Sequence, residues 1–349
     1  MKLKEDTLKL FADVENRIDP DCEDDFRNQW IQFLENRFEG NIFTTHRNKK
    51  TAPSFVHEAI NINDAMESYE LMLASQLMGV SHILSTDNQL ISVRSNYGSG
   101  IMSSLFGAEI FLMPYEMNTL PTTRIFDDND RIRKISEGGI PNIEGGFGKR
   151  TFEMGELFLE VFDKYPKIKK YVPVYHPDLQ GPIDIAELMW GSEMFYAMYD
   201  EPSLVHRLLR VITDTYKAFL DKWFKMFPPS EDFNVHWSTV MHRGKILLRD
   251  DSAMNLSDEL YREFAYPYDN ELLEYYGGGV IHFCGRGDHY IASMSRSPKL
   301  YGINMTQPEL NDMETIYRST VDKNIKIMGF SRKWAEECSR DFHGQMHCL

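Results

Sequence analysis

The chain alternates between short apolar runs and longer stretches with helical spacing of apolar residues. The runs typical of buried strands lie at 89–95, 171–175, 234–240, 245–249, 280–284, 300–304 and 325–329. Strands that alternate with helices favour a parallel sheet covered by helices. A chain of 349 residues is long enough to close such a sheet, so we predict a single (β/α)8 TIM-type barrel. An open doubly wound sheet is the alternative, although neither a GxGxxG motif after a strand nor a GK[ST] phosphate loop is present.

The amino-terminal part of the sequence departs from this alternation. The first forty residues have apolar positions at helical spacing, such as Leu10, Phe11 and Val14. We therefore predict an N-terminal helical extension over residues 1–45 and a barrel domain over residues 46–349. A glycine-rich stretch at 125–149 is predicted to be a long surface loop or a mobile lid.

The charge of the chain excludes some classes of partner. A formal net charge of -15 would repel polyanions, so we expect neither nucleic acid nor an anionic membrane surface as a partner. No apolar run approaches the length of a transmembrane helix. Cys22, Cys284, Cys338 and Cys348 show no CxxC spacing, which indicates free thiols in a reducing compartment. We expect a cytoplasmic protein.

His282 and Cys284 are two residues apart at the end of an apolar run. On a strand, this spacing places the imidazole and the thiol on the same face. With a further ligand they could hold a zinc ion through nitrogen and sulfur. Cys338 on the predicted final helix could be that ligand, although burial of the helix also explains it. The alternative for the pair is a buried cysteine beside a histidine that hydrogen-bonds to a backbone carbonyl.

Two adjacent carboxylates, Asp250 and Asp251, follow another strand-like run. Both cannot be buried without a cation, a proton or several hydrogen-bond donors, so one of them could act as a base or an anchor. The alternative is that they form salt bridges with Arg243 or Arg249, or cap a turn.

Further polar residues follow the predicted strands, where a barrel places its catalytic groups. Gln180 is a candidate catalytic residue, because the adjacent Gly181 would admit a ligand closely; a turn fixed by Pro182 is the alternative. The candidate substrate-binding residues are Asn96, Tyr97, Asp178, Arg286 and Arg332.

The carboxyl-terminal tail carries a second metal-like group, His343, His347 and Cys348. Its two histidines are spaced as ligands on one helical turn can be. Chain ends without packing are usually frayed, so we do not expect a native metal site there.

Several blocks of the sequence match one known superfamily in order and separation over about residues 50 to 332. These blocks are Asn96-Tyr97-Gly98 with Leu105-Phe106-Gly107, Asp178-Leu179-Gln180-Gly181-Pro182, Asp250-Asp251 with Leu256-Ser257-Asp258-Glu259, Phe264 and Pro267, and His282-Phe283-Cys284-Gly285. With these blocks the chain resembles the uroporphyrinogen decarboxylase superfamily, which also contains zinc- and corrinoid-dependent methyltransferases. The resemblance implies a single (β/α)8 barrel whose mouth admits a tetrapyrrole or the face of a corrinoid.

The resemblance to the methyltransferases implies a zinc site. His282 and Cys284 match the first two ligands of the methyltransferase motif. The later cysteine of that motif is absent, because the chain reads Gly329-Phe330-Ser331-Arg332 at its place. Cys338 or an acidic residue would have to complete the site.

Three functions are compatible with the resemblance. The first is a methyltransferase that moves a methyl group between a corrinoid on a separate carrier protein and a thiol activated on zinc. The second is a carboxy-lyase that acts on a tetrapyrrole, as uroporphyrinogen decarboxylase does, with Asp250 or Asp251 holding the pyrrole nitrogens. The third is a non-catalytic barrel that binds a corrinoid or its carrier protein.

Overall fold

A six-stranded parallel sheet forms the centre of the protein. The structure is a computed structural model that describes residues 2–349. Within these residues the strand order of the sheet is β1-β10-β9-β8-β7-β6, and every pair of neighbours is parallel. The strands are β1 (Ile42–Phe43), β6 (Ile246–Arg249), β7 (Gly279–Phe283), β8 (Leu300–Met305), β9 (Lys326–Phe330) and β10 (Met346–Cys348). The predicted α/β class is confirmed.

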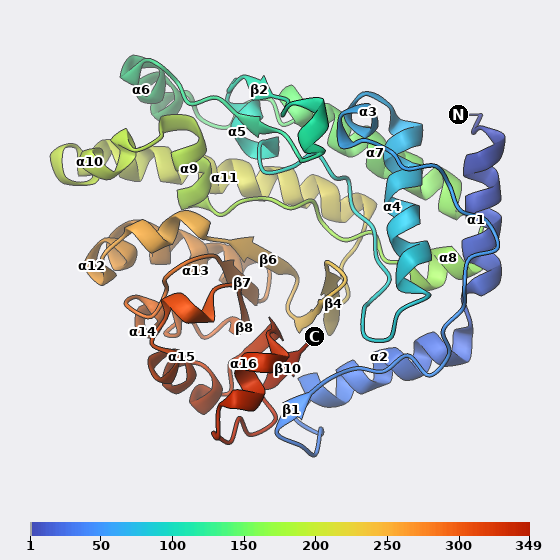
Figure 1. Cartoon of the computed structure of the whole chain (residues 1–349). Helices are drawn as coiled ribbons and strands as arrows, with labels where there is room; N and C mark the ends of the chain where they lie inside the picture. The colour runs from blue at the N-terminus through green and yellow to red at the C-terminus, as the bar shows by residue number, and fades with distance from the viewer. Residues whose placement is uncertain (1) are drawn as a thin grey trace.

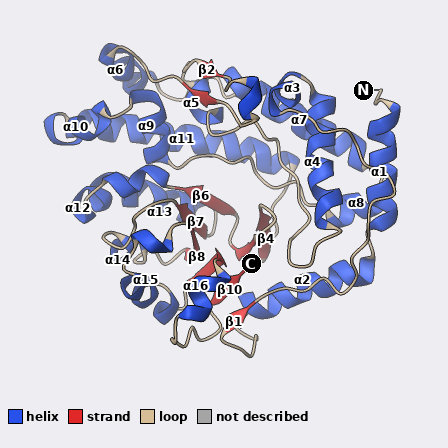
Figure 2. Ribbon diagram, in the orientation of Figure 1, coloured by secondary structure: helices blue, strands red, loops and turns tan. Residues whose placement is uncertain are grey.

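Helices surround the strands in a ring, with the carboxyl terminus inside it (Figures 1 and 2). In the first half of the chain they are α1 (Glu5–Arg17), α2 (Pro20–Leu34), α3 (Ile62–Glu67), α4 (Tyr69–Ile83), α5 (Ile101–Leu105), α6 (Asn129–Gly138), α7 (Gly146–Phe162) and α8 (Pro166–Tyr171). They continue with α9 (Pro182–Trp190), α10 (Glu193–Asp200), α11 (Pro202–Met226), α12 (Asp258–Leu260), α13 (Tyr266–Tyr275), α14 (Ile291–Met294), α15 (Met313–Ser319) and α16 (Arg332–Glu337). This arrangement is consistent with a TIM-like barrel, and closure of the sheet through eight strands stays a prediction.

The segments 89–95 and 171–175 are not regular strands, contrary to the prediction. They meet in one isolated parallel bridge between Val93 and Val174. The Val93 amide donates to the carbonyl of Pro173, and the Tyr175 amide donates back to the carbonyl of Val93. Pro173 has no amide hydrogen and therefore cannot extend this ladder. Tyr171 belongs to the end of α8.

The segment 234–240 is a hairpin rather than the single strand expected. β4 (Phe233–His236) and β5 (Val240–Arg243) pair antiparallel as a separate two-stranded sheet. The turn begins at Trp237, which adopts a left-handed backbone conformation with φ of 53°. This conformation is uncommon for a bulky side chain. The turn contains no glycine, proline or asparagine from which it could be predicted. A smaller antiparallel pair joins β2 (Ile110–Phe111) and β3 (Thr122–Thr123).

The glycine-rich stretch 125–149 contains regular structure, so the prediction of a long loop is wrong, whereas a mobile lid stays a prediction. It holds α6 and the first residues of α7. The Asp128 side chain accepts a hydrogen bond from the Asp130 amide and so caps α6. Gly139, with φ of 72°, ends this helix.

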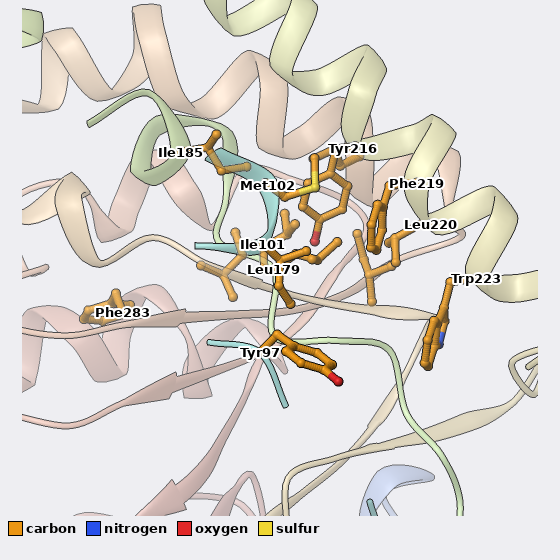
Figure 3. Close-up of a cluster of buried hydrophobic side chains, with 14 of the residues drawn as sticks. Tyr97, Ile101, Met102, Leu179, Ile185, Tyr216, Phe219, Leu220, Trp223 and Phe283 are labelled. Carbon is orange, nitrogen blue, oxygen red and sulfur yellow. The ribbon is translucent and has the colours of Figure 1, made fainter. Parts of the chain in front are cut away.

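The buried side chains form a core between the helices and the sheet. Figure 3 shows part of it, where Tyr97, Tyr216 and Trp223 lie among aliphatic side chains. The amino-terminal helix α1 buries Leu10 and Phe11 in the same core. The predicted extension therefore packs against the rest of the chain, and it contributes β1 to the sheet.

The carboxyl terminus is an ordered strand, contrary to the expected frayed end. β10 pairs with β1 on one side and β9 on the other. His347 is buried against the ring of Trp30 at 4.3 Å, and its Nδ1 accepts a hydrogen bond from the Gly329 amide. Cys348 is also buried, whereas His343 is exposed and pairs with Asp341. These residues therefore do not converge as metal ligands.

Among the described residues, no helix combines the length and apolar character needed to cross a bilayer.

Candidate metal centre

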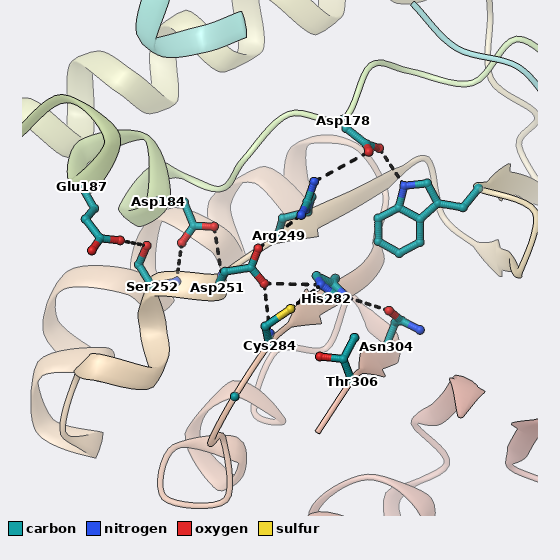
Figure 4. A network of polar contacts seen from close by, with 12 residues as sticks. Asp178, Asp184, Glu187, Arg249, Asp251, Ser252, His282, Cys284, Asn304 and Thr306 are labelled. Carbon is teal, nitrogen blue, oxygen red and sulfur yellow. Dashed lines mark hydrogen bonds and ion pairs between the residues drawn. The ribbon is translucent and has the colours of Figure 1, made fainter. Parts of the chain in front are cut away.

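Asp251, His282 and Cys284 converge at the carboxyl ends of β6 and β7 (Figure 4). The register of the two strands pairs Arg249 with His282, so the residues that follow both strands meet at one edge. His282 Nε2 lies 3.3 Å from Asp251 Oδ1 and 3.3 Å from Cys284 Sγ. One ligand atom from each residue lies within 4.8 Å of the others.

This donor set fits a zinc ion. Nitrogen, sulfur and carboxylate oxygen are the atoms that bind zinc in proteins, and the mixture of thiolate and imidazole favours zinc over magnesium or calcium. Ligand atoms around a tetrahedral zinc stand about 3.5 Å apart, given the usual bond lengths. The distances from His282 already match this value. Three protein ligands would leave the fourth position free for a substrate or water.

The neighbours of His282 orient its ring toward this cluster. His282 Nδ1 donates a hydrogen bond of 2.6 Å to Asn304 Oδ1, which directs Nε2 toward Asp251 and Cys284. The side-chain amide of Asn304, through Nδ2, in turn donates a hydrogen bond of 2.6 Å to the backbone carbonyl of Met328. Asn304 is therefore the residue that positions the imidazole.

Asp251 is held by backbone as well as side-chain contacts. Its Oδ1 accepts the amide hydrogen of Cys284 at 3.0 Å. Asp184 in α9 accepts the amide hydrogens of Asp251 and Ser252, at 2.9 Å and 2.7 Å. The Ser252 hydroxyl donates to Glu187 one helical turn further along. The start of α9 thereby fixes the turn that presents Asp251.

The electrostatics of the cluster favour an ionised Asp251. Burial alone would raise the pKa of Asp251, but the His282 hydrogen bond and the charges of His282 and Arg249 lower it to about 2. Burial alone would lower the pKa of His282, but hydrogen bonds to Asp251 and Cys284 raise it to about 9. Without a metal ion, the pair is an imidazolium beside a carboxylate.

Asp250 has the opposite environment from its neighbour. Asp250 is fully buried. Burial, together with the Asp269 carboxyl group that lies close in space, raises the pKa of Asp250 well above the ordinary range. Burial also raises the pKa of Asp269, to about 8. Two buried carboxyl groups in contact share a proton, because both cannot be charged without a cation. Of the two adjacent aspartates, therefore, only Asp251 is available as an anionic ligand.

A set of polar side chains extends from Asp251 at the carboxyl edge of the sheet. Arg249 Nη2 lies 3.3 Å from Asp251 Oδ2, and its Nη1 lies 3.7 Å from Asp178 Oδ2. Arg94 also donates to Asp178, and Trp237 Nε1 donates to it at 2.8 Å. Asp178, predicted to bind substrate, thus belongs to the network around the cluster.

Two of the predicted substrate-binding residues lie apart from this network. The Arg286 side chain is 61% exposed and pairs with Asp288. The Arg332 side chain is 50% exposed and pairs with Glu336 one helical turn away. Both guanidinium groups are held by nearby carboxylates and do not converge on the cluster.

The remaining predicted site residues divide between the network and the core. Asn96 accepts a hydrogen bond of 2.9 Å from Arg94. Gln180 is buried, and its Oε1 has no hydrogen-bond partner in the described residues. Tyr97 is fully buried in the hydrophobic core. Cys338 follows α16, packs on the core and is not part of the metal-like group, in which Asp251 takes the place predicted for it.

Asp184 and Trp237 are among the residues of the site that were not predicted from the sequence. Asp184 is the one acidic residue in the otherwise apolar stretch Pro182-Ile183-Asp184-Ile185-Ala186, and this contrast was a usable signal. Trp237 lies in a turn without glycine, proline or asparagine, so no strong local signal indicates its position.

Similarity to a solved structure supports this fold. No protein-family model matches the chain, and no curated protein does. Among solved structures, a methyltransferase from Methanosarcina mazei is similar, with a TM-score of 0.62 and 14% sequence identity. The match covers 86% of this chain and 81% of that one. The two proteins share a fold.

Proposed function

We propose that this protein is a methyltransferase in which a zinc-bound thiol exchanges a methyl group with a corrinoid. The convergence of Asp251, His282 and Cys284 at the carboxyl edge of the sheet carries the proposal. The fold shared with a methyltransferase and the resemblance to corrinoid-dependent enzymes support it. We expect the corrinoid to arrive on a separate carrier protein in the cytoplasm.

The bound metal would supply Lewis acidity that lowers the pKa of a substrate thiol. In the transfer, the thiol loses its proton to solvent, and its sulfur forms a bond to the methyl carbon. The cobalt–carbon bond breaks, and its electron pair remains on cobalt.

The residues of the chain have distinct roles in this proposal. Asp251, His282 and Cys284 would hold the ion, and Asn304 orients the imidazole. Asp184 anchors the backbone of Asp251.

The two other functions lose support in this geometry. A carboxylate-rich tetrapyrrole needs several free cations at the mouth, but Arg286 and Arg332 lie in separate ion pairs. A non-catalytic barrel was suggested by incomplete zinc ligation, and Asp251 now provides a third donor. We therefore propose neither.

The test combines metal analysis with an assay of methyl transfer. We expect the purified protein to contain about one zinc per chain and to demethylate methylcobalamin in the presence of a thiol. His282→Ala and Cys284→Ala should lose both properties, whereas Cys338→Ala should keep them. A wild-type protein without zinc, or Cys284→Ala with unchanged activity, would contradict the proposal.

A further inference from the structure

A polar pocket lies at the opposite end of the strands from the cluster of Asp251, His282 and Cys284. Its volume is about 540 Å³. It lies near the amino-terminal ends of β8 and β9, whereas the cluster follows the carboxyl ends of β6 and β7. The residues that line it are Leu34, Glu35, Asn36, Arg37, Arg243, Tyr301, Asn324 and Lys326.

Within residues 2–349, Lys326 is a buried cation without an acidic partner. The residue is only 4% exposed, and Nζ donates to the neutral oxygens of Asn36 and Gln345 at 2.8 Å and 2.9 Å. The ring of Phe33 lies 4.3 Å from the ammonium. Burial and the nearby Arg243 lower the pKa of Lys326 to about 8. Buried charges in proteins are normally paired, so this ammonium lacks a counter-ion.

Two further donors that line the pocket are unused. Within the described residues, the Arg243 guanidinium makes no hydrogen bond or ion pair, although it lies 5.7 Å from the Phe233 ring. The Tyr301 hydroxyl has no hydrogen-bond partner there either. Glu35, the single carboxylate among the lining residues, is held by Arg37. Two cations therefore remain uncompensated in a chain whose net charge is -15.

We propose that this pocket binds a phosphate group, either as inorganic phosphate or as the ester of a small molecule. A phosphate dianion matches the two uncompensated cations, Arg243 and Lys326. The planar guanidinium can donate to two phosphate oxygens, and the ammonium acts as a point charge. Binding would also give the buried Lys326 the counter-ion that it lacks. This site is independent of the proposed methyl transfer.

Calorimetry and thermal unfolding of the full chain test this assignment at constant ionic strength. The probes are inorganic phosphate and glycerol 3-phosphate, with acetate as a comparator. We expect one saturable phosphate site per chain and a higher melting temperature, and acetate should produce neither. Arg243→Gln should weaken phosphate binding at least about tenfold, and Lys326→Gln should abolish it. Arg318→Gln, which removes an exposed arginine paired with Glu314, is the matched control.

The outcomes separate the two sources of phosphate. Equal affinity for the two probes assigns the site to the phosphate group alone, whereas tenfold tighter binding of the ester assigns it to a phosphorylated metabolite. If Lys326→Gln does not fold, the substitution of the exposed Arg243 decides the question alone. Absence of saturable binding for both probes, or equal binding by Arg243→Gln and wild type, overturns the proposal.

Discussion

Replacement of Asp251 by asparagine gives the sharpest test of the candidate metal centre. The substitution keeps the shape of the side chain but removes its charge. In the metal-free protein, the pKa of His282 stands at about 9 instead of its ordinary 6.5, because Asp251 and Cys284 hold its proton. This difference corresponds to roughly 3 kcal/mol, at about 1.4 kcal/mol per pKa unit. Because Asp251 provides much of it, we expect Asp251→Asn to lower the pKa of His282 by at least about one unit.

The same substitution should weaken zinc binding. Four-ligand structural zinc sites bind with about 10–16 kcal/mol, or roughly 3 kcal/mol for each ligand. Loss of one anionic ligand should therefore lower zinc affinity about 100-fold. NMR titration of the His282 ring gives the pKa, and competition with a chromophoric chelator gives the affinity.

Cys338→Ala is the matched control for this prediction. Cys338 packs on the core beyond α16, so its loss should leave both quantities unchanged. The reasoning is refuted if Asp251→Asn binds zinc within about threefold of wild type. It is also refuted if Cys338→Ala loses zinc instead.

Three further predictions concern the surroundings of the cluster. Asn304→Ala removes the acceptor of His282 Nδ1 and should weaken zinc binding about 10–100-fold in a competition titration. Zinc affinity should rise with pH up to about 9, because the raised pKa means that His282 must lose a proton before it can bind; pH-dependent proton release on zinc addition measures this. Gly181→Ala would place a Cβ 2.3 Å from Asp250 Oδ1 and should lower the free energy of unfolding by about 1–3 kcal/mol in urea. Gly79→Ala, with no atom within 4 Å, should instead raise it by about 0.5–1 kcal/mol, and similar effects of the two substitutions would contradict this packing argument.

The sequence predicted the strands whose apolar runs are buried on both faces. β7, β8 and β9 lie close to the predicted positions, because parallel strands under helices have continuous apolar runs. The hairpin of β4 and β5 was missed, since the turn at Trp237 depends on tertiary contacts. The Trp237 indole donates to Asp178, and its carbonyl accepts from Ser92, so distant parts of the chain hold its left-handed backbone.

The candidate site was predicted in part for a similar physical reason. The spacing of His282 and Cys284 is local, and alternation along a strand places both side chains on one face. The third donor is not local, because it depends on the register that pairs Arg249 of β6 with His282 of β7. The sequence therefore left Cys338 or an acidic residue as the third ligand, and the structure places the acidic Asp251 beside the pair.

The sequence by itself determined the positions of β7, β8 and β9 and the imidazole–thiol pair at a strand end, because both follow from short-range periodicity. Only the tertiary structure decided which acid completes the cluster. Asp250 and Asp251 are chemically identical neighbours, but Asp250 is buried against Asp269 and its pKa rises, while Asp251 faces His282 and its pKa falls. Desolvation and charge contacts are properties of the packed chain, so they separate two residues that the sequence presents as equal.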